Sequence, residues 1–351
     1  MPDSAGFSAA TEPCRRELFA HCYRMVGSVA DAEDLVQETY LRAWRFYDGF
    51  AGRSSVRTWM YQIATNACLT ALAKRKRRGL PSGFYDPEPD PGMPAAEAGP
   101  DVAWLDPVPD ALALPEAADP AVIVAARAGL RLALIASLQY LPPRQRAVLV
   151  LRDVLDFSAA EVAAMLGSTT ASVKSALQRA RARIAELSPA ADQIAEPAAP
   201  QARALLEEYI AAFERADAAA LERLLVRDVI LEATPLRTWF AGRAGCVPFL
   251  RDHVFGPPGT WRMLPASANG QPAAVEYLRD ARGDYRPYGV VVLTVCAAGI
   301  SRVTSFGDPR LVALFGFPGD GLRAGGVPAS RETPGGTRAA VQAHDHEGLV
   351  A

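Results

Sequence analysis

The spacing of apolar residues divides the chain into two helical blocks and a mixed block. Over 10–78, apolar side chains recur at intervals of three and four residues, as in Leu18–Met25, and a break at Gly27-Ser28 separates two such stretches. The same helical spacing returns over 121–188. We therefore expect two all-α domains, each built from helices joined by turns.

From residue 201 the pattern mixes helical and strand-like stretches. Two helical stretches, 201–215 and 218–225, come first. Asn269-Gly270 is a hairpin-turn signal between two of the strand-like runs that follow. These runs lie at 229–233, 261–265, 273–278, 290–297 and 300–304. The pattern predicts an α+β domain over 201–317.

Three segments have compositions that are typical of linkers and tails. Residues 79–120 contain ten prolines, nine acidic residues and no basic residue, so we expect an extended linker that packs no core. Residues 188–200 are rich in Ala and Pro and indicate a second linker. The end of the chain, 318–351, is rich in Gly, Pro and Arg and is predicted to be disordered.

Charge is segregated along the chain, although the net charge is only −2. Residues 1–78 carry +4 and 121–190 carry +5, whereas the linker between them carries −9. Two basic blocks separated by an acidic segment favour nucleic-acid binding by the blocks.

The remaining composition excludes several classes of protein. The five cysteines are scattered without a metal-binding spacing, so we expect neither a metal nor another cofactor. The start of the chain lacks the layout of a signal peptide, and the longest apolar run, 289–300, is too short to span a membrane. The sequence therefore predicts a cytoplasmic protein without membrane contact.

A helix-turn-helix pattern lies in the second helical block. Ser158 and Glu161 form a capping box at the start of one short helix, a turn follows at 167–170, and a basic helix starts near Ala171. Val173 and Leu177 are expected on its packing face. Its exposed face offers hydrogen-bond donors to base edges and phosphates from Ser172, Lys174, Ser175, Gln178, Arg179 and Arg181.

Two charged stretches lie in the first helical block. The basic run Lys74, Arg75, Lys76, Arg77 and Arg78 is expected at the end of a long helix, where it would contact phosphates or interact with the helix dipole. Asp31–Glu38 is acidic and partly amphipathic. No His, Lys or metal-ligand set accompanies these acids, so the stretch favours a protein-binding surface over a catalytic one.

Two long motifs then make the chain recognisable. Asp31–Trp44 (DAEDLVQETYLRAW) and Ser55–Asn66 (SVRTWMYQIATN) resemble region 2 of the extracytoplasmic-function (ECF) group of sigma-70 family factors. Leu141–Arg146 (LPPRQR), together with Ser158–Arg183, resembles their region 4. The resemblance implies a subunit that binds core RNA polymerase and recognises the −35 and −10 promoter elements to initiate transcription.

The resemblance also assigns expected roles to residues. The polymerase-binding surface would comprise Asp31, Glu33, Asp34, Leu35, Gln37 and Glu38. The −10 element would be melted and read by Arg53, Ser55, Arg57, Trp59, Gln62 and Asn66, together with Lys74, Arg75, Arg77 and Arg78. Asn66 can donate to and accept from a base edge, whereas Trp59 is a candidate for base stacking or for the core. Arg144 and the exposed face of the helix from Ala171 would read the −35 element.

The mixed block resembles the SnoaL-like fold, a curved sheet wrapped by helices that often encloses a pocket. Tyr209–Asp217, Leu221–Val229 and Trp239–Arg243 carry this resemblance. The expected architecture is thus two all-α domains followed by an α+β SnoaL-like domain. In sigma factors of this type the tail is thought to regulate activity in place of a separate anti-sigma protein. For this chain we expect that a small molecule or a protein acts as the regulator at the tail.

Two alternative functions remain open. The first is a helix-turn-helix regulator that binds DNA without polymerase, although it leaves 31–66 unexplained. The second is a SnoaL-type isomerase or hydrolase with a nucleic-acid-binding appendage. For that chemistry Asp252, Glu276 and Tyr277 are candidates by residue type alone. We expect no catalytic site.

Overall fold

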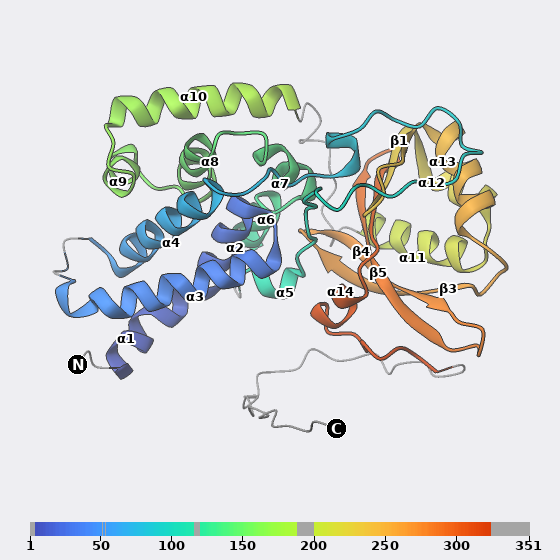
Figure 1. Ribbon diagram of the computed structural model, residues 1–351, viewed down its shortest axis with the longest axis horizontal. Coiled ribbons are helices and arrows are strands. Elements are labelled where there is room, and N and C mark those ends of the chain that lie inside the picture. The colour runs from blue at the N-terminus through green and yellow to red at the C-terminus, as the bar shows by residue number, and fades with distance from the viewer. Residues whose placement is uncertain (1–3, 51, 53, 116–119, 188–199, 324–351) are drawn as a thin grey trace, which may run out of the picture.

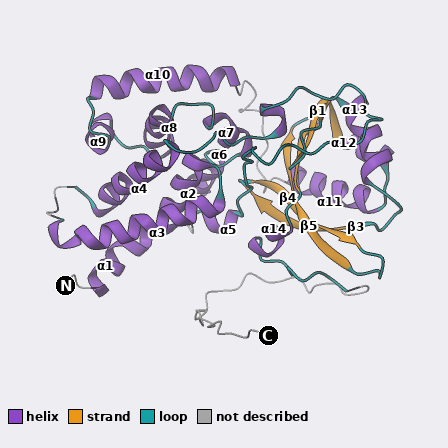
Figure 2. Cartoon of the chain, in the orientation of Figure 1, coloured by secondary structure: helices purple, strands orange, loops and turns teal. Residues whose placement is uncertain are grey.

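The computed structural model describes residues 4–50, 52, 54–115, 120–187 and 200–323. Its helical domains form one side of the molecule and a β-sheet with its own helices forms the other (Figure 1). The linker leaves the helical side, runs over the sheet domain near β1 and returns (Figure 1). The distribution of helices, strands and loops is shown in Figure 2.

The first helical domain contains four helices packed around one core. They are α1 (Ser4–Thr11), α2 (Arg15–Val26), α3 (Val29–Phe46) and α4 (Val56–Leu72), with short 3-10 turns at Glu12–Cys14 and Tyr47–Gly49. Gly27 ends α2 in the left-handed region at φ +71°, and the Ser28 side chain caps α3. Because α4 ends at Leu72, the basic run 74–78 lies beyond the helix and not in its last turn, where it was expected.

The second helical domain contains the predicted helix-turn-helix. Its helices are α6 (Pro120–Ala128), α7 (Leu132–Leu138), α8 (Pro143–Leu149), α9 (Ala159–Met165) and α10 (Thr170–Leu187), with a π-helical turn at Val150–Val154. Ser158 and Glu161 form the capping box at the start of α9. Val173 and Leu177 of α10 are buried, as their spacing predicts.

The sheet has six strands in the order β2-β1-β6-β5-β4-β3. Only β1 and β6 pair in parallel; the other neighbours are antiparallel. The strands are β1 (Leu225–Thr234), β2 (Trp239–Ala241), β3 (Trp261–Ala268), β4 (Gln271–Arg279), β5 (Tyr285–Cys296) and β6 (Gly299–Phe306). The multidomain fold class, with two all-α domains and an α+β tail, is confirmed.

Helices cover both faces of the sheet. One face packs against α11 (Pro200–Glu214), α12 (Ala218–Leu224) and α13 (Arg243–Phe249), which continues into a π-helical turn at Leu250–Val254. The other face packs against α14 (Pro309–Leu314) and the helical domains. Side chains alternate along a strand, so in β4 Ala274 packs in the core beneath α11–α13, whereas Val275 packs in the core shared with α14 and the helical domains. The sequence pattern missed β2, α13 and α14.

The linker does not remain free of the core, in contrast to what its composition predicts. Leu105 and Val108 are 1% and 0% exposed, and α5 (Asp110–Ala113) contributes the buried Ala113. A 3-10 turn at Pro81–Gly83 lies on the sheet domain. Few apolar side chains suffice because the linker adds to cores that other elements already form.

The two remaining irregular segments are described only in part. Residues 318–323 are ordered, since Leu322 is 9% exposed and pairs with Tyr285, which corrects the first residues of the predicted disordered tail. The rest of that tail, 324–351, lies outside the described residues, as does 188–199 of the second linker. Within the described parts, no single helix is long and apolar enough to cross a membrane, although the bent pair Ala121–Ala128 and Leu132–Leu138 passes that test jointly.

The turn between β3 and β4 joins three other parts of the molecule. Asn269 is 0% exposed, and its Nδ2 donates to the hydroxyl of Tyr23 in α2 (2.8 Å) and to the carbonyl of Leu130 (2.9 Å). Its Oδ1 accepts from the backbone of Val108 in the linker (3.0 Å). Both helical domains and the linker thus meet at one side chain of the tail.

The residues after Asn269 extend this joint. The backbone N–H of Gly270 donates to Asp110 Oδ1 (2.7 Å), and the backbone N–H of Leu132 donates to Gln271 Oε1 (2.8 Å). Asn269 and Gly270 have φ of +55° and +66°, the backbone of the predicted Asn-Gly turn. A Cβ on Gly270 would lie 2.9 Å from that of Arg127, so only glycine fits here.

Candidate nucleic-acid and protein interfaces

The exposed face of α10 has the geometry expected of a recognition helix. Ser172, Lys174, Ser175, Gln178 and Arg179 are all exposed, on the side opposite the buried Val173 and Leu177. The Arg179 guanidinium donates to Ser175 Oγ at 2.6 Å, a contact along the helix surface that leaves further N–H groups available. Donors to bases and phosphates therefore gather on one solvent-exposed surface.

Two other predicted −35 residues are engaged within the protein. Arg181 forms a bidentate ion pair with Asp153 of the π-helical turn, at 2.8 and 2.7 Å. Arg144 donates to the carbonyl of Leu166 at the end of the first helix of the motif (3.1 Å). Both residues hold α10 and α9 in place, so the structure gives them a positioning contact where the sequence predicted a DNA contact.

The predicted −10 surface on α4 faces the second helical domain. Asn66 is exposed, but its Nδ2 lies 3.5 Å from the carbonyl of Met165 in α9. Arg57 stacks over the rings of Tyr61 and Phe157, 4.9 Å from each centroid. Tyr61, which is 0% exposed, also makes an edge contact with Phe157 and is unavailable to bases. Part of this surface is therefore covered by the helix-turn-helix domain.

The other predicted −10 residues lie along the same helix or just before it. Trp59, Gln62 and Asn66 share one face of α4, and Trp59 is half-buried against Phe50 with ring centroids 4.8 Å apart. Ser55 caps α4 by accepting from the backbone of Thr58. Arg53 lies outside the described residues.

The basic run contacts the protein itself. Arg75 and Arg78 both pair with Asp31, the latter at 2.9 Å. Arg77 lies over the rings of Phe84 and Tyr140, 4.5 and 4.1 Å from their centroids. Lys74 is exposed, and Lys76 pairs with Asp101 on the surface. In this conformation the run mainly holds the linker and α3, in contrast to the predicted phosphate contacts.

The acidic stretch on α3 is mostly exposed and polar, but Glu38 is paired within the helix and Leu35 is buried. Glu33, Asp34 and Gln37 are exposed. Glu38 pairs with Arg42 one turn later, a surface pair that contributes little to stability. Leu35 is 4% exposed and belongs to the core, so the expectation that it contacts a partner directly is wrong for this conformation.

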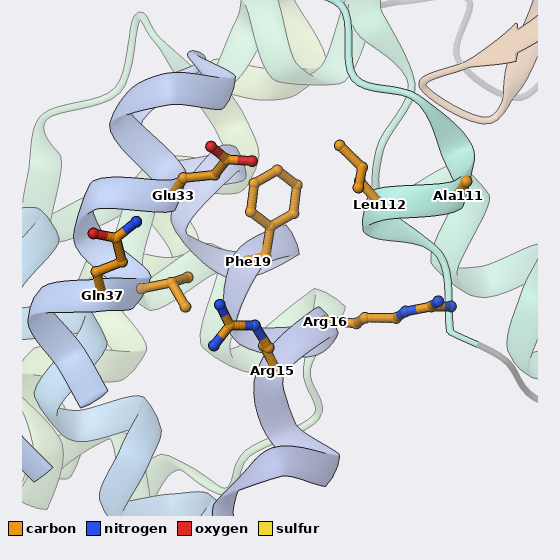
Figure 3. A pocket seen from close by; sticks show the side chains of 8 residues that line it. Arg15, Arg16, Phe19, Glu33, Gln37, Ala111 and Leu112 are labelled. Carbon is orange, nitrogen blue, oxygen red and sulfur yellow. The ribbon is translucent and has the colours of Figure 1, made fainter. Parts of the chain in front are cut away.

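A groove borders this acidic surface. Glu33 and Gln37 of α3 lie on one side, Arg15 and Phe19 of α2 at its base, and the linker helix α5 on the other side (Figure 3). Leu112 of α5 points across the groove toward Phe19 (Figure 3). The groove has a volume of about 410 Å³. The linker thus lies beside the predicted partner-binding surface, a contact that linker composition did not indicate.

The tail encloses a separate cavity of about 450 Å³ between the sheet and α11–α13. Its walls are mostly apolar and aromatic, with Tyr209, Phe213, Phe240, Phe249, Trp261, Tyr288, Leu231 and Val303 among the lining side chains. Pro94 and Ala95 of the linker also line it. A cavity of this size suits a small molecule.

Glu276 on β4 is one of two buried carboxyl groups that line this cavity, the other being Glu232 on β1. Glu276 is 3% exposed and accepts a hydrogen bond from Ser305 Oγ at 2.8 Å. Burial raises the pKa of Glu276 to about 7, and the Ser305 hydrogen bond opposes that rise. Burial, and next the Glu276 charge, raise the pKa values of Tyr209 and Tyr288, which line the same cavity.

The other two residues considered for catalysis lie elsewhere. Asp252 is exposed and pairs with Arg251, which lowers the pKa of the Asp252 carboxyl. Tyr277 points to the opposite face of β4, where its hydroxyl donates to the carbonyl of Pro318 (3.1 Å). The structure therefore does not bring the three candidates together, and only Glu276 faces the cavity.

The comparisons with known proteins agree with this architecture. The family models "Sigma-70 region 2" and "Sigma-70, region 4" match residues 11–78 and 131–184. The first helical domain, the helix-turn-helix domain and their order define a sigma-70-type transcription factor.

Relatives narrow the class further. The chain is 49% identical over 315 residues to the ECF RNA polymerase sigma factor SigG of Mycobacterium tuberculosis, covering 89% of this chain and 84% of the relative. It is 29% identical to SigW of Bacillus subtilis over 181 residues, 51% of this chain and 87% of the relative. The chain belongs to the ECF RNA polymerase sigma factors.

A solved structure has the same overall fold. The crystal structure of the Mycobacterium tuberculosis ECF sigma factor SigJ matches with a TM-score of 0.58 and 21% sequence identity, covering 89% of this chain and 99% of SigJ. The likeness to SigJ concerns the fold, and the tail has the helix-covered sheet that the SnoaL-like resemblance implies.

Burial of Glu276 generates a prediction about stability and pH. The folded-state pKa of about 7 exceeds the ordinary value of 4.5, so the folded protein binds this proton more tightly than the unfolded chain. The associated stability is present below pH 4.5 and is lost as the pH rises through 7. A shift of this size corresponds to roughly 3 kcal/mol.

Glu276→Gln should therefore differ from the wild type by less than about 1 kcal/mol at pH 5 and be more stable by roughly 3 kcal/mol at pH 8, because Gln keeps the Ser305 hydrogen bond without a charge. Urea unfolding at both pH values measures the difference. Glu208→Gln, at an exposed position of α11, is the control. An equal difference at pH 5 and pH 8 would contradict the assigned burial effect.

Proposed function

We propose that this ECF sigma factor binds core RNA polymerase through the exposed acidic surface of α3 and reads promoter DNA through α4 and α10. The observation that carries the proposal is the exposed face of α10, where Ser172, Lys174, Gln178 and Arg179 project together from a capped helix-turn-helix. Lys and Arg on such a helix provide both phosphate attraction and base-edge donors. Core polymerase and promoter DNA are the partners that define this family.

Single substitutions test the −35 assignment. Lys174→Ala and Arg179→Ala should each weaken promoter-dependent transcription by roughly 5- to 100-fold, since a specific Arg or Lys contact contributes about 1–3 kcal/mol. Transcript yield from a promoter template with core polymerase is the measurement. Arg203→Ala, exposed on α11 of the tail, is the matched control. Wild-type transcript levels from both variants would reject the role of α10.

The polymerase-binding assignment concerns the polar surface of α3. Glu33, Asp34 and Gln37 are exposed on it and Glu38 is half-buried at its edge. Carboxylates that are exposed beside apolar side chains suit a partner of complementary charge. Asp31 belongs to the same proposed surface, although here it is paired with Arg75 and Arg78.

Charge reversal tests this surface. Asp34→Lys combined with Glu38→Lys should weaken capture of core polymerase at least tenfold, because the new charges repel the partner that the acids attract. Both positions lie on the helix surface, so we expect an unchanged circular dichroism spectrum. Glu208→Lys on α11 controls for charge reversal alone. Undiminished holoenzyme assembly would remove α3 from the interface.

We further propose that the tail inhibits the factor by holding its helical domains together. The carrying contacts are the Asn269 joint and the cover of α4 by the helix-turn-helix domain at Met165 and Phe157. To read two separated promoter elements, α4 and α10 must face the DNA at the same time. The tail therefore favours a closed state, in which the helical domains stay together and which binding of core polymerase and promoter DNA must open.

Weakening the joint should raise the affinity for core polymerase. Asn269→Gly keeps the positive φ and removes the buried amide that Tyr23, Leu130 and Val108 share, a loss of about 2–4 kcal/mol that shifts the population toward the open state. We expect a rise of at least threefold in core affinity, measured by fluorescence anisotropy. Arg282→Gly, in the exposed β4–β5 turn, is the control. Unchanged or weaker binding by folded Asn269→Gly would overturn the inhibitory role.

A catalytic role for the tail is the alternative. Glu232 and Glu276 are buried in the cavity wall, but Asp252 and Tyr277 lie away from the cavity. We propose initiation of transcription without catalysis, in the cytoplasm where core polymerase acts.

A further inference from the structure

The cavity in the tail is closed in part by a segment that belongs to a different part of the chain. Pro94 and Ala95 lie in the linker between the two helical domains, more than a hundred residues before the tail, yet they line the cavity. The other lining residues come from α11, from α13 and the π-helical turn that continues it, from the loop between β1 and β2, and from the sheet. The site is therefore composite, and its shape depends on where the linker lies.

Regular hydrogen bonds fix this part of the linker on the loop between β1 and β2. The backbone N–H of Ala96 donates to Thr238 Oγ1 (2.9 Å), and the N–H of Arg237 donates to the carbonyl of Ala96 (2.8 Å). The N–H of Ala98 donates to the carbonyl of Pro235 (3.1 Å). On the other side of Pro94, the N–H of Glu88 donates to the carbonyl of Trp239 (2.8 Å). Residues 88–98 thus form a lid, which we call the linker lid.

A second contact connects the cavity wall to the start of the linker. Glu232, which lines the cavity and is 1% exposed, accepts from the backbone N–H of Ser82 (3.1 Å). Arg302 pairs with the same carboxylate at 2.5 Å and donates to Ser82 Oγ. Arg302 already neutralises Glu232. The other carboxyl group that lines the cavity, Glu276, is therefore the one available to a ligand.

The polar groups in the cavity define the chemistry of an occupant. Glu276 is buried, its carboxyl group bonds to Ser305 alone among the described residues, and no cation pairs with it there. The hydroxyls of Tyr209 and Tyr288 likewise make no hydrogen bond to any described side chain or backbone group. Apolar side chains form most of the remaining wall, and the rings of Phe213, Phe240, Phe249 and Trp261 are among them. His253 also lines the cavity, but it is exposed, stacks on Phe249 and forms no ion pair with Glu276. An anion beside Glu276 would therefore meet a buried carboxyl group with no paired cation, whereas a neutral molecule with an O–H or N–H group could donate to it.

We propose that this cavity binds an uncharged, largely aromatic or alicyclic molecule that donates a hydrogen bond to Glu276, and that its binding holds the linker lid on the tail. A ligand that contacts both the tail and the lid binds the docked arrangement more tightly than an undocked one. By linkage it stabilises the docked lid by the same factor. The ligand thus sets the position of the linker that joins the two promoter-reading domains.

Three probes of nearly equal shape test the chemistry on the full chain at pH 8. They are 2-naphthol, which has one donor; 2-methylnaphthalene, which has none; and 2-naphthoate, which is an anion. In equilibrium dialysis we expect 2-naphthol to bind with a Kd below 1 mM and at least fivefold more tightly than either of the others. Glu276→Gln should reduce the preference for 2-naphthol over 2-methylnaphthalene by about fivefold, because a neutral acceptor forms the weaker hydrogen bond.

Amide hydrogen exchange tests the coupling to the linker lid. With saturating 2-naphthol, exchange of the Glu88, Ala96 and Ala98 amides should slow at least threefold, while the Thr58 amide at the start of α4 should not change. Slower exchange in the sheet with unchanged exchange in the lid would overturn the coupling.

The binding measurements also test the proposed ligand class of the cavity. Absence of 2-naphthol binding to the folded protein, or equal binding of 2-naphthoate, would overturn the proposed ligand class. Neither assay contains polymerase or DNA, so the result is independent of the proposed roles of α3, α4 and α10.

Discussion

The arrangement of the whole molecule depends on one buried amide. Asn269 has no access to water, so each of its hydrogen-bonding groups needs a partner within the protein. Those partners come from α2, from the linker and from the segment before α7, through Tyr23, Val108 and Leu130. Removal of any one of them would leave a buried polar group unsatisfied at a cost of about 1–3 kcal/mol. The three segments and the tail therefore assemble as a set.

Two buried arginines lie in the otherwise largely apolar contact between the helical domains. Arg24 donates to the carbonyl of Gly129, and Arg146 donates to the carbonyl of Met25 and to Gln139. Burial lowers the pKa of each of these two arginines to about 10, a measure of how much water they have lost. Both arginines recover hydration when the domains separate, which offsets part of the cost of exposing the apolar residues around them.

Sequence reasoning succeeded where local chemistry decides the outcome. The helix-turn-helix was predicted from the Ser158–Glu161 capping box and the spacing of Val173 and Leu177, and the Asn269-Gly270 turn from its dipeptide. These signals depend on backbone hydrogen bonding and on helical periodicity, which neighbouring residues determine.

Long-range contacts were not predictable in the same way. Nothing in the composition of the linker indicates that Leu105 and Val108 complete a core made by other segments. The partners of the basic run were missed because Arg78 meets Asp31 only after α3 and α4 have packed. The cavity lies between elements far apart in sequence, so no local pattern predicts it. The one available signal was the charged Glu276 within an otherwise apolar strand-like run, and it does not show which way the side chain faces.

The pairing of Asp31 with Arg75 and Arg78 connects two surfaces for which separate roles are proposed. A carboxylate that neutralises two guanidinium groups cannot at the same time neutralise a cation on another protein. When a partner takes Asp31, both arginines lose their counter-ion and become free to attract the DNA backbone. Under the roles proposed for Asp31 and the basic run, binding of core polymerase at Asp31 would free two positive charges for the DNA template, so the first association would strengthen the second.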